Sequence, residues 1–127
     1  MAKAKILIIE DDPDISGLLG LRLKRDDYDT AFASDAVTAM TVARKERPDL
    51  ILLDIGLPGG GGMLVMERLK AIAPLAHVPI IVVSARDAAS TEEQVLRAGA
   101  RAFLPKPIEM ERLLATVRGA LGETDGP

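Results

Sequence analysis

Residues Lys5-Ile-Leu-Ile-Ile-Glu-Asp-Asp12 decide the fold, because an uninterrupted apolar run leads directly into three acidic residues. An apolar run without polar alternation is typical of a strand that is buried on both faces, as in a parallel sheet covered by helices. Acidic residues that directly follow such a strand lie outside its carboxyl end, where open α/β sheets bind their ligands. The segment therefore predicts a central parallel strand that leads into a polar site.

Similar short apolar runs recur along the chain. The predicted strands are Lys5–Ile9, Asp29–Ala33, Leu50–Leu53, Ile80–Val83 and Ala102–Leu104. The first, third and fourth lack polar alternation and fit the centre of a sheet, whereas the second and fifth are more mixed and fit its edges.

Segments with helical spacing of apolar residues alternate with these strands. The first helix is expected to begin with Asp12 as N-cap and Pro13 in its first turn. The helices that follow it are predicted at about Ala36–Glu46, Met63–Ala73, Asp87–Ala98 and Met110–Leu121. Gly99 is expected to end the fourth helix as its C′ residue.

Five β/α units with right-handed crossovers predict a flavodoxin-like α/β fold: a doubly wound, five-stranded parallel sheet of order 2-1-3-4-5 with five helices. Strands one and three are then neighbours at the point where the strand order reverses. Residues 1–121 are expected to form this single domain. Residues 122–127, Gly-Glu-Thr-Asp-Gly-Pro, are expected to be a flexible tail or the remnant of a linker.

Composition narrows the classes of function. The 127 residues include no cysteine, which excludes disulfides, thiolate catalysis and cysteine zinc sites. With 16 Lys and Arg against 19 Asp and Glu, the formal charge of -3 offers no basic footprint for nucleic acid. No apolar run approaches the roughly 18 residues of a membrane span, and the first run is too short for a signal peptide. A cytoplasmic protein is therefore expected.

Four polar residues fall just past the predicted strands, namely Glu10, Asp11, Asp54 and Lys106. Three carboxylates in one pocket repel one another unless a cation lies between them, and a lysine can neutralise phosphate oxygens. The group therefore predicts a site for a divalent cation beside a phosphoryl group.

The chain resembles the receiver domains of two-component response regulators, which share the fold of the bacterial chemotaxis regulator. The resemblance covers essentially the whole chain and has four motifs in the family's order and at family-like separations. These are Ile6-Leu-Ile-Ile-Glu-Asp-Asp12, Asp49-Leu-Ile-Leu-Leu-Asp54-Ile-Gly-Leu-Pro58, Ser84-Ala85 and Phe103-Leu-Pro-Lys106-Pro107.

The resemblance implies that Asp54 is the phosphoacceptor and takes a phosphoryl group from a phosphohistidine of a histidine kinase or histidine phosphotransfer protein. It implies Mg²⁺ as the cofactor, bound by Asp11, Asp54 and the backbone carbonyl of Gly56, and by Glu10 through water. The domain would catalyse its own phosphorylation and dephosphorylation, yet it would be a signalling protein rather than an ordinary enzyme.

The resemblance also implies how such a domain switches. Lys106 would pair with Asp54 at rest and with the phosphate afterwards, helped by a cis peptide bond to Pro107. The Ser84 hydroxyl would follow the new phosphate, and Phe103 would be the switch aromatic residue. The face formed by helix four, strand five and helix five would then contact a downstream target or output domain.

Two segments depart from the family pattern. Gly59-Gly-Gly-Gly62 stands where many receivers carry Gly-Met-Asp-Gly, which predicts a mobile loop and a late start of the third helix. Arg101-Ala102 replaces an acidic pair that is common in receivers that dimerise through salt bridges. A monomer or weak dimer is therefore expected.

Three other functions fit parts of the sequence less well. A phosphatase of the haloacid dehalogenase type requires an Asp two residues after the nucleophile, where this chain has Gly56. A flavodoxin-like FMN carrier needs a phosphate-binding loop after the first strand, where Glu10-Asp-Asp12 would repel phosphate. A receiver-like interaction scaffold without phosphotransfer usually lacks the acceptor or the lysine, and this chain has both.

Overall fold

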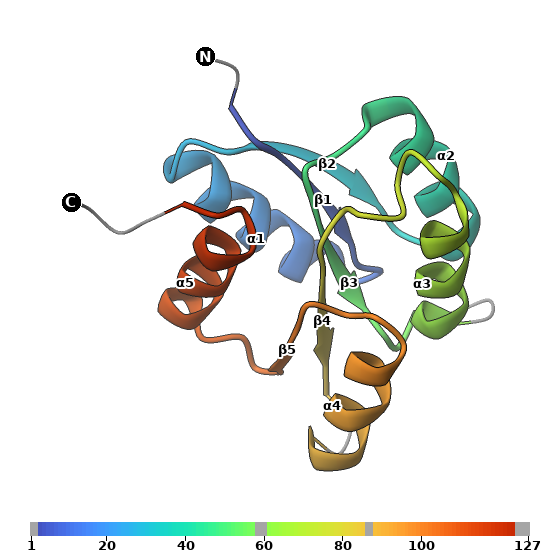
Figure 1. Ribbon diagram of the computed structural model, residues 1–127. Coiled ribbons are helices and arrows are strands. Elements are labelled where there is room, and N and C mark those ends of the chain that lie inside the picture. The colour runs from blue at the N-terminus through green and yellow to red at the C-terminus, as the bar shows by residue number, and fades with distance from the viewer. Residues whose placement is uncertain (1–2, 58–60, 86–87, 124–127) are drawn as a thin grey trace.

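The computed structural model describes residues 3–57, 61–85 and 88–123 (Figure 1). Strands and helices alternate along the chain as β1 (Lys5–Ile9), α1 (Pro13–Arg25), β2 (Asp29–Ala33), α2 (Ala36–Glu46), β3 (Leu50–Asp54), α3 (Gly61–Ala71), β4 (Ile80–Ser84), α4 (Ala88–Arg97), β5 (Ala102–Pro105) and α5 (Met110–Ala120). All strand pairs are parallel, and the order is β2-β1-β3-β4-β5. The predicted flavodoxin-like topology is confirmed.

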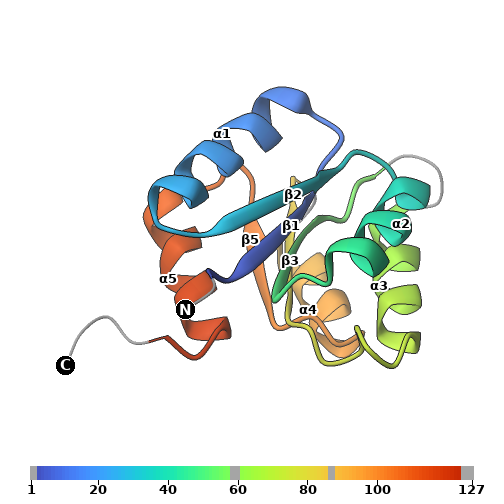
Figure 2. The ribbon, with the colours of Figure 1, turned by 90° about the horizontal axis from the view of Figure 1, so that it is seen from above.

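The sheet is covered on both faces, and this explains the continuous apolar strands. Leu7 and Ile9 of β1 belong to the core beneath α2 and α3, whereas Ile6 and Ile8 belong to the core beneath α1 and α5. Figure 2 shows the two helical layers, with α1 and α5 on one side of the sheet and α2, α3 and α4 on the other. Among the described helices, none combines the length and apolar character that a bilayer span requires.

Three strands end one residue later than the sequence predicted, at Asp54, Ser84 and Pro105. Asp54 is in register with Val83, and Ser84 with Pro105. The backbone ladder even continues beyond them, since the Lys106 N–H donates to the Ser84 carbonyl at 2.8 Å. A parallel ladder is made of backbone groups, so it does not stop where the side chains become polar.

Helix α3 begins at Gly61, and the predicted late start is therefore wrong. Gly61 has a φ of +77°, which glycine adopts without strain. The Gly62 N–H donates to the Ile55 carbonyl at 3.0 Å, so the first turn of α3 lies directly against the segment after β3. The predicted mobile loop also included Gly59 and Gly60, which lie outside the described residues.

Glycines close both α4 and α5. Gly99, predicted to end the fourth helix, has a φ of +109°, and the N–H of Ala100 donates to the Val95 carbonyl at 2.9 Å. This is the hydrogen bond of a Schellman C-cap. Helix α4 itself spans Ala88–Arg97, and the predicted first residue, Asp87, lies outside the described part of the chain.

The first two residues of the expected tail contact the domain at the end of α5. Gly122 has a φ of +76°, and the Glu123 N–H donates to the Arg118 carbonyl at 2.8 Å. The Tyr28 hydroxyl donates to Glu123 Oε1 at 2.9 Å. Residues 122 and 123 therefore end α5 in contact with the domain. Residues 124–127 lie outside the described residues.

The contact between Tyr28 and Glu123 predicts an unusual titration. Burial, the hydrogen bond to Glu123 and the charge of Glu123 together raise the pKa of Tyr28 to about 12. Because the native state holds this proton more tightly than the unfolded chain, whose tyrosine titrates near about 10, the free energy of unfolding should fall as pH rises through this interval.

The chain contains one tyrosine, so tyrosinate absorbance during an alkaline titration reports Tyr28 alone. Glu123→Gln keeps a hydrogen-bond acceptor but removes the charge, and it should lower the Tyr28 pKa. Titration of the folded wild-type protein at the ordinary tyrosine value would contradict this prediction.

Candidate functional site

Three acidic side chains meet at the carboxyl edge of the sheet. Glu10 and Asp11 directly follow β1, and Asp54 is the last residue of β3. These strands are neighbours, with Ile9 paired with Leu53. As a result, carboxylate oxygens of all three acids lie within 4.8 Å of one another. The structure therefore assembles the acidic group that the sequence predicted.

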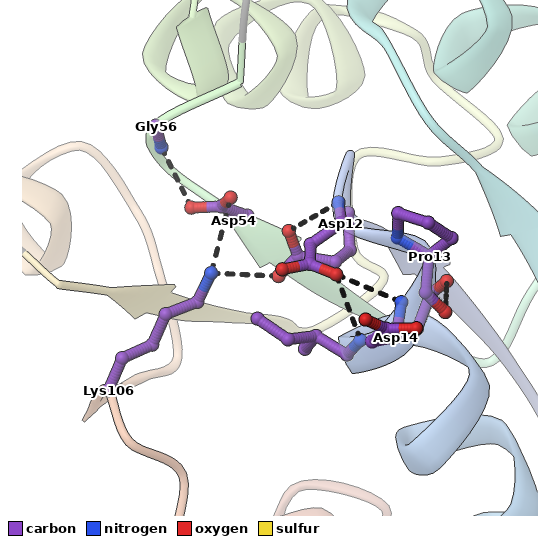
Figure 3. Close-up of polar contacts among 9 residues, drawn as sticks. Asp12, Pro13, Asp14, Asp54, Gly56 and Lys106 are labelled. Atoms are coloured by element: carbon purple, nitrogen blue, oxygen red, sulfur yellow. Dashed lines mark hydrogen bonds and ion pairs between the residues drawn. The ribbon is translucent and has the colours of Figure 1, made fainter.

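Lys106 reaches into this group from the end of β5 (Figure 3). Its Nζ lies 2.9 Å from Glu10 Oε1 and 3.4 Å from Asp54 Oδ2. The Lys106–Pro107 peptide bond is cis, as the resemblance implied. The resemblance implies Asp54 as the resting partner of Lys106, but the closer contact is to Glu10. Which of two neighbouring carboxylates is nearer depends on side-chain positions that no spacing in the sequence reveals.

The site is shielded from water, and this shapes its electrostatics. The side chains of Glu10 and Asp54 are only 3% and 9% exposed, and that of Lys106 is 18% exposed. Burial raises the pKa of Glu10, and the charge of Asp54 adds to this effect, although hydrogen bonds from Lys106 and from the Asp12 N–H oppose it. Burial, with a smaller contribution from the neighbouring carboxylate, thus makes Glu10 easier to protonate than an exposed glutamate.

The pKa of Lys106 is also raised, which for this base favours the charged form. Burial opposes its charged form, but the hydrogen bond to Glu10 and the charges of Asp54 and Glu10 outweigh burial and raise the pKa of Lys106. The ammonium is therefore held in its protonated form. When all three carboxyl groups are ionised, this one cation leaves two negative charges uncompensated, which favours the binding of a divalent cation.

Backbone amides orient the two buried acids. The Gly56 N–H donates to Asp54 Oδ1 at 2.9 Å (Figure 3), and the Asp12 N–H donates to Glu10 Oε2 at 3.1 Å. The Asp12 side chain caps α1 by accepting from the Asp14 N–H at 2.9 Å, as predicted. These contacts fix the directions of the Glu10 and Asp54 oxygens without using the exposed Asp11.

Ser84 lies farther along the same edge, whereas Phe103 lies within the neighbouring strand β5. Ser84 ends β4, the strand beside Asp54, and is 1% exposed. Its carbonyl accepts the Lys106 N–H, so the two residues are joined through the backbone. Phe103 lies on β5 opposite Val82, and its side chain is buried in the core on the face of the sheet that α2, α3 and α4 cover.

Four polar side chains are buried within the described part of the chain. They are Glu10, Asp54, Ser84 and Thr91. The first three were all predicted. Thr91 of α4 was not singled out, because a lone threonine in an amphipathic helix carries no signal of burial.

The acidic group fits Mg²⁺. This ion takes hard oxygen ligands in an octahedron, in which opposite ligands lie roughly 4 Å apart, and it keeps several waters. Carboxylate oxygens that lie within 4.8 Å of one another match these requirements after small rotations or with a bridging water. The lysine beside them occupies the place where it can also contact an anion.

Comparison with known sequences gives consistent matches. The family model for the response regulator receiver domain matches residues 6–118. The DNA-binding dual master transcriptional regulator RpaA of Synechocystis sp. is 37% identical over 121 residues, which cover 95% of this chain and 50% of RpaA. The polar-differentiation response regulator DivK of Brucella anthropi is 35% identical, with 93% of this chain and 96% of DivK covered. The chain thus spans about half of RpaA but nearly all of DivK.

Solved structures agree with the sequence matches. A putative response regulator from Chloroflexus aurantiacus superposes with a TM-score of 0.90 at 27% identity, covering 95% of this chain and 99% of that one. The receiver domain of a sensor histidine kinase from Pseudomonas aeruginosa, solved with a magnesium ion in its active-site cleft, gives a TM-score of 0.86 at 28% identity, covering 96% of this chain and 100% of that one.

Proposed function

The chain belongs to the receiver domain family of two-component response regulators, and on that premise we propose that Asp54 is its phosphoacceptor. The observation that supports this assignment most strongly is the position of Asp54 at the end of β3. There one carboxylate oxygen accepts the Gly56 N–H and the other lies 3.4 Å from the Lys106 ammonium. No other carboxylate in the described residues has both contacts.

The proposed reaction is a phosphoryl transfer between two side chains. An Asp54 oxygen attacks the phosphorus of a phosphohistidine, so that an O–P bond forms and the P–N bond breaks, with its electron pair returning to the imidazole. Lys106 neutralises the phosphoryl oxygens during transfer and afterwards. Water later attacks the phosphorus of the acyl phosphate, the bond between phosphorus and the Asp54 oxygen breaks, and inorganic phosphate leaves. This regenerates the Asp54 carboxylate, so the domain itself would carry out both its phosphorylation and its dephosphorylation.

We assign the metal ligands to Asp11, Asp54 and the Gly56 carbonyl, with Glu10 acting through water. When bound there, Mg²⁺ would offset the charge of the carboxylates and of the incoming phosphoryl oxygens. The magnesium ion in the receiver domain from Pseudomonas aeruginosa supports this choice of metal. Glu10 suits an indirect role because it holds the closer contact with the Lys106 ammonium, at 2.9 Å against 3.4 Å for Asp54.

Metal removal tests this function. Incubation of the wild-type protein with acetyl phosphate and Mg²⁺ should add the mass of one phosphoryl group, since the site supplies the nucleophile and the cation binds the donor. Excess EDTA should reduce the labelling rate by about two orders of magnitude or more. Intact-mass spectrometry follows the adduct. Labelling at the same rate with and without EDTA would contradict the proposal.

Phosphorylation is proposed to switch the face formed by α4, β5 and α5. A phosphoryl group adds about -1.5 to -2 charges, and the site already holds three carboxylates, so the new group must recruit Lys106 and the Ser84 hydroxyl. These two residues are joined by the hydrogen bond between the Lys106 N–H and the Ser84 carbonyl. Their movement, with that of Phe103, would shift the population of conformations across this face.

An apolar cavity beside the site suits a protein as phosphodonor. It has a volume of about 240 Å³ and is lined by Lys106, Pro107 and Ile108 and by Ile15, Leu18 and Leu19 of α1. Leu18 and Leu21 of the same helix are 61% and 69% exposed. Large apolar side chains that remain exposed next to a reactive group are typical of a surface that a partner covers.

Leu18→Asp separates a protein donor from a small one. The charge should slow phosphoryl transfer from a phosphorylated histidine phosphotransfer protein about tenfold or more, because it must be buried on docking. Labelling by acetyl phosphate should stay unchanged, since this donor needs no docking surface. Leu96→Asp, on α4, is the matched control and should transfer normally. Equal slowing with both donors would show that Leu18 acts on the site itself.

The proposed upstream partner is a histidine kinase or histidine phosphotransfer protein, and the downstream partner is an output domain or separate target. RpaA and DivK differ in length by about half, so both arrangements occur among the relatives. We also propose a cytoplasmic location, where kinases obtain ATP, and a monomer or weak dimer. Arg101 is exposed where an acidic residue would be needed for salt-bridged dimers.

A receiver-like scaffold without phosphotransfer is not favoured. Such a domain has no need for an acceptor, a lysine and two further acids in contact, and here all four are assembled. A phosphatase of the haloacid dehalogenase type also remains unsupported, because Gly56 stands where its acid is required.

A further inference from the structure

A groove runs between α2 and α3 on the face of the sheet opposite α1 and α5. Figures 1 and 2 both show these two helices side by side. The groove has a volume of about 490 Å³ and is lined by Val37, Met40 and Arg44 from α2 and by Arg68, Ala71 and Ile72 from α3 and its end. A second groove of about 280 Å³ shares Arg44 and Ile72 with it and adds Arg47 and Leu75. The two form one continuous surface, which we call the α2–α3 groove.

The charges of the α2–α3 groove are all of one sign. Arg44, Arg47 and Arg68 line it, and no acidic residue does. None of these three arginines forms an ion pair with any residue in the ranges 3–57, 61–85 and 88–123. Elsewhere, Arg22 pairs with Glu111 and Arg97 with Glu93, whereas Arg25, Arg101 and Arg112 lie apart from one another and also lack an ion pair within the described residues. Three uncompensated guanidinium groups therefore surround one groove of an otherwise acidic protein.

The floor of the groove is apolar. Met40 is 8% exposed and Ile72 packs partly buried against the core, whereas Val37 at the edge is 77% exposed. An apolar floor with arginines around it is the composition of a protein-binding surface, since interfaces are enriched in arginine around a desolvated centre. Nucleic acid would require a broader basic surface without an apolar floor, and the chain carries a net charge of -3.

The helix dipole explains only part of this arrangement. Arg44 and Arg68 lie in the last turns of α2 and α3, where a cation is favoured. Arg47 lies beyond the end of α2 at a φ of +47°, a position that usually belongs to glycine or asparagine. A favourable position at a helix end would also not require that arginines from two different helices line the same groove.

We propose that the α2–α3 groove binds an acidic, partly apolar segment of a partner protein. Aliphatic or aromatic side chains of the segment lie on Val37, Met40 and Ile72, and its carboxylates pair with the arginines, whose planar guanidinium groups bind carboxylates in a bidentate manner. Because α2 runs antiparallel to the strands, its carboxyl end with Arg44 and Arg47 lies toward the edge of the sheet opposite Asp54. Binding is therefore independent of phosphorylation.

A selection from a displayed random peptide library tests this proposal with the full chain. Peptides are selected on the wild-type protein and then measured on Arg44→Glu/Arg68→Glu. The enriched peptides should combine Asp or Glu with Leu, Ile or Phe and should bind the double variant at least about tenfold more weakly. Arg112→Glu is the matched control, because this exposed arginine of α5 also lacks an ion pair within the described residues. It should bind as the wild type does.

Two further measurements distinguish the other outcomes. Backbone amide shifts in the bound protein should cluster in α2 and α3, and Asp54→Ala should leave the affinity unchanged. The proposal is overturned if the peptides bind the double variant equally well, if the shifts cluster around Lys106 and α1, or if the affinity depends on Asp54. Binding of a duplex oligonucleotide that needs Arg44 and Arg68, with no selected peptide that does, would assign the groove to nucleic acid instead. The double variant should stay folded with a slightly lower thermal midpoint, because glutamate is less favourable than arginine in the last turn of a helix.

Discussion

Replacement of Asp54 by alanine is expected to abolish phosphoryl labelling by acetyl phosphate. The methyl group offers no nucleophilic oxygen, and of the two neighbouring acids Glu10 already uses both of its oxygens in contacts with protein groups. The loss should therefore be complete within the detection limit of intact-mass spectrometry rather than partial. A full single adduct on Asp54→Ala would contradict the assignment of the acceptor.

The fold should survive this substitution. Asp54 is 7% exposed and lies near Glu10, so its removal relieves a repulsion between buried carboxylates, while Lys106 keeps its closer contact to Glu10. The midpoint of thermal unfolding should be unchanged or higher. Asp29→Ala is the control, because this exposed carboxylate begins β2 at the other edge of the sheet and should leave labelling intact.

Gly62→Ala is expected to destabilise the protein although it lies within a helix. Helix propensity favours alanine over glycine by about 1 kcal/mol. At this position, however, a Cβ would lie 2.6 Å from Ile55 Cα and 2.7 Å from the Asp54 carbonyl oxygen. Both are backbone atoms, so relief requires that α3 or the end of β3 moves. Overpacking of this kind costs about 1–3 kcal/mol, and the clash should outweigh the propensity.

The same clash should disturb the site, because the displaced backbone carries Asp54. The remaining folded protein should therefore label more slowly with acetyl phosphate. Gly17→Ala in α1 is the matched control, since no atom lies within 4 Å of its added Cβ. That variant should gain about 0.5–1 kcal/mol. Urea denaturation followed by circular dichroism measures both, and a stabilised Gly62→Ala would show that the backbone contact is not rigid.

The architecture could be predicted from the sequence because each strand and helix is marked by residues that are neighbours along the chain. Continuous apolar runs mark buried parallel strands, and Asp12 with Pro13 marks a helix start, so these features needed no tertiary information. The strand ends were misplaced because backbone ladders continue through polar residues such as Asp54 and Ser84. The start of α3 was misplaced because a glycine run was interpreted as flexible, whereas Gly62 is required by close approach to Ile55.

The candidate site was predictable as a group but not in its internal pairing. The topology alone brings Glu10, Asp11 and Asp54 to adjacent strand ends. The nearer contact of Lys106 to Glu10 depends on rotamers and burial. The arginines of the α2–α3 groove carried no signal either, since Arg44 and Arg68 belong to different helices and converge only in the fold.

Because Lys106 lies closer to Glu10 than to Asp54, one acid holds the ammonium in place and the other is available as the phosphoacceptor. The cation is anchored at 2.9 Å by a carboxylate that forms no covalent bond in the proposed chemistry, and it reaches the acceptor only at 3.4 Å. The Asp54 oxygen is thus only weakly paired before the phosphodonor binds. The Lys106 ammonium nevertheless already lies beside the oxygen that would attack the phosphorus. The unphosphorylated protein therefore already has the arrangement that the transfer requires. The incoming phosphoryl group need not first break a strong ion pair between Lys106 and Asp54.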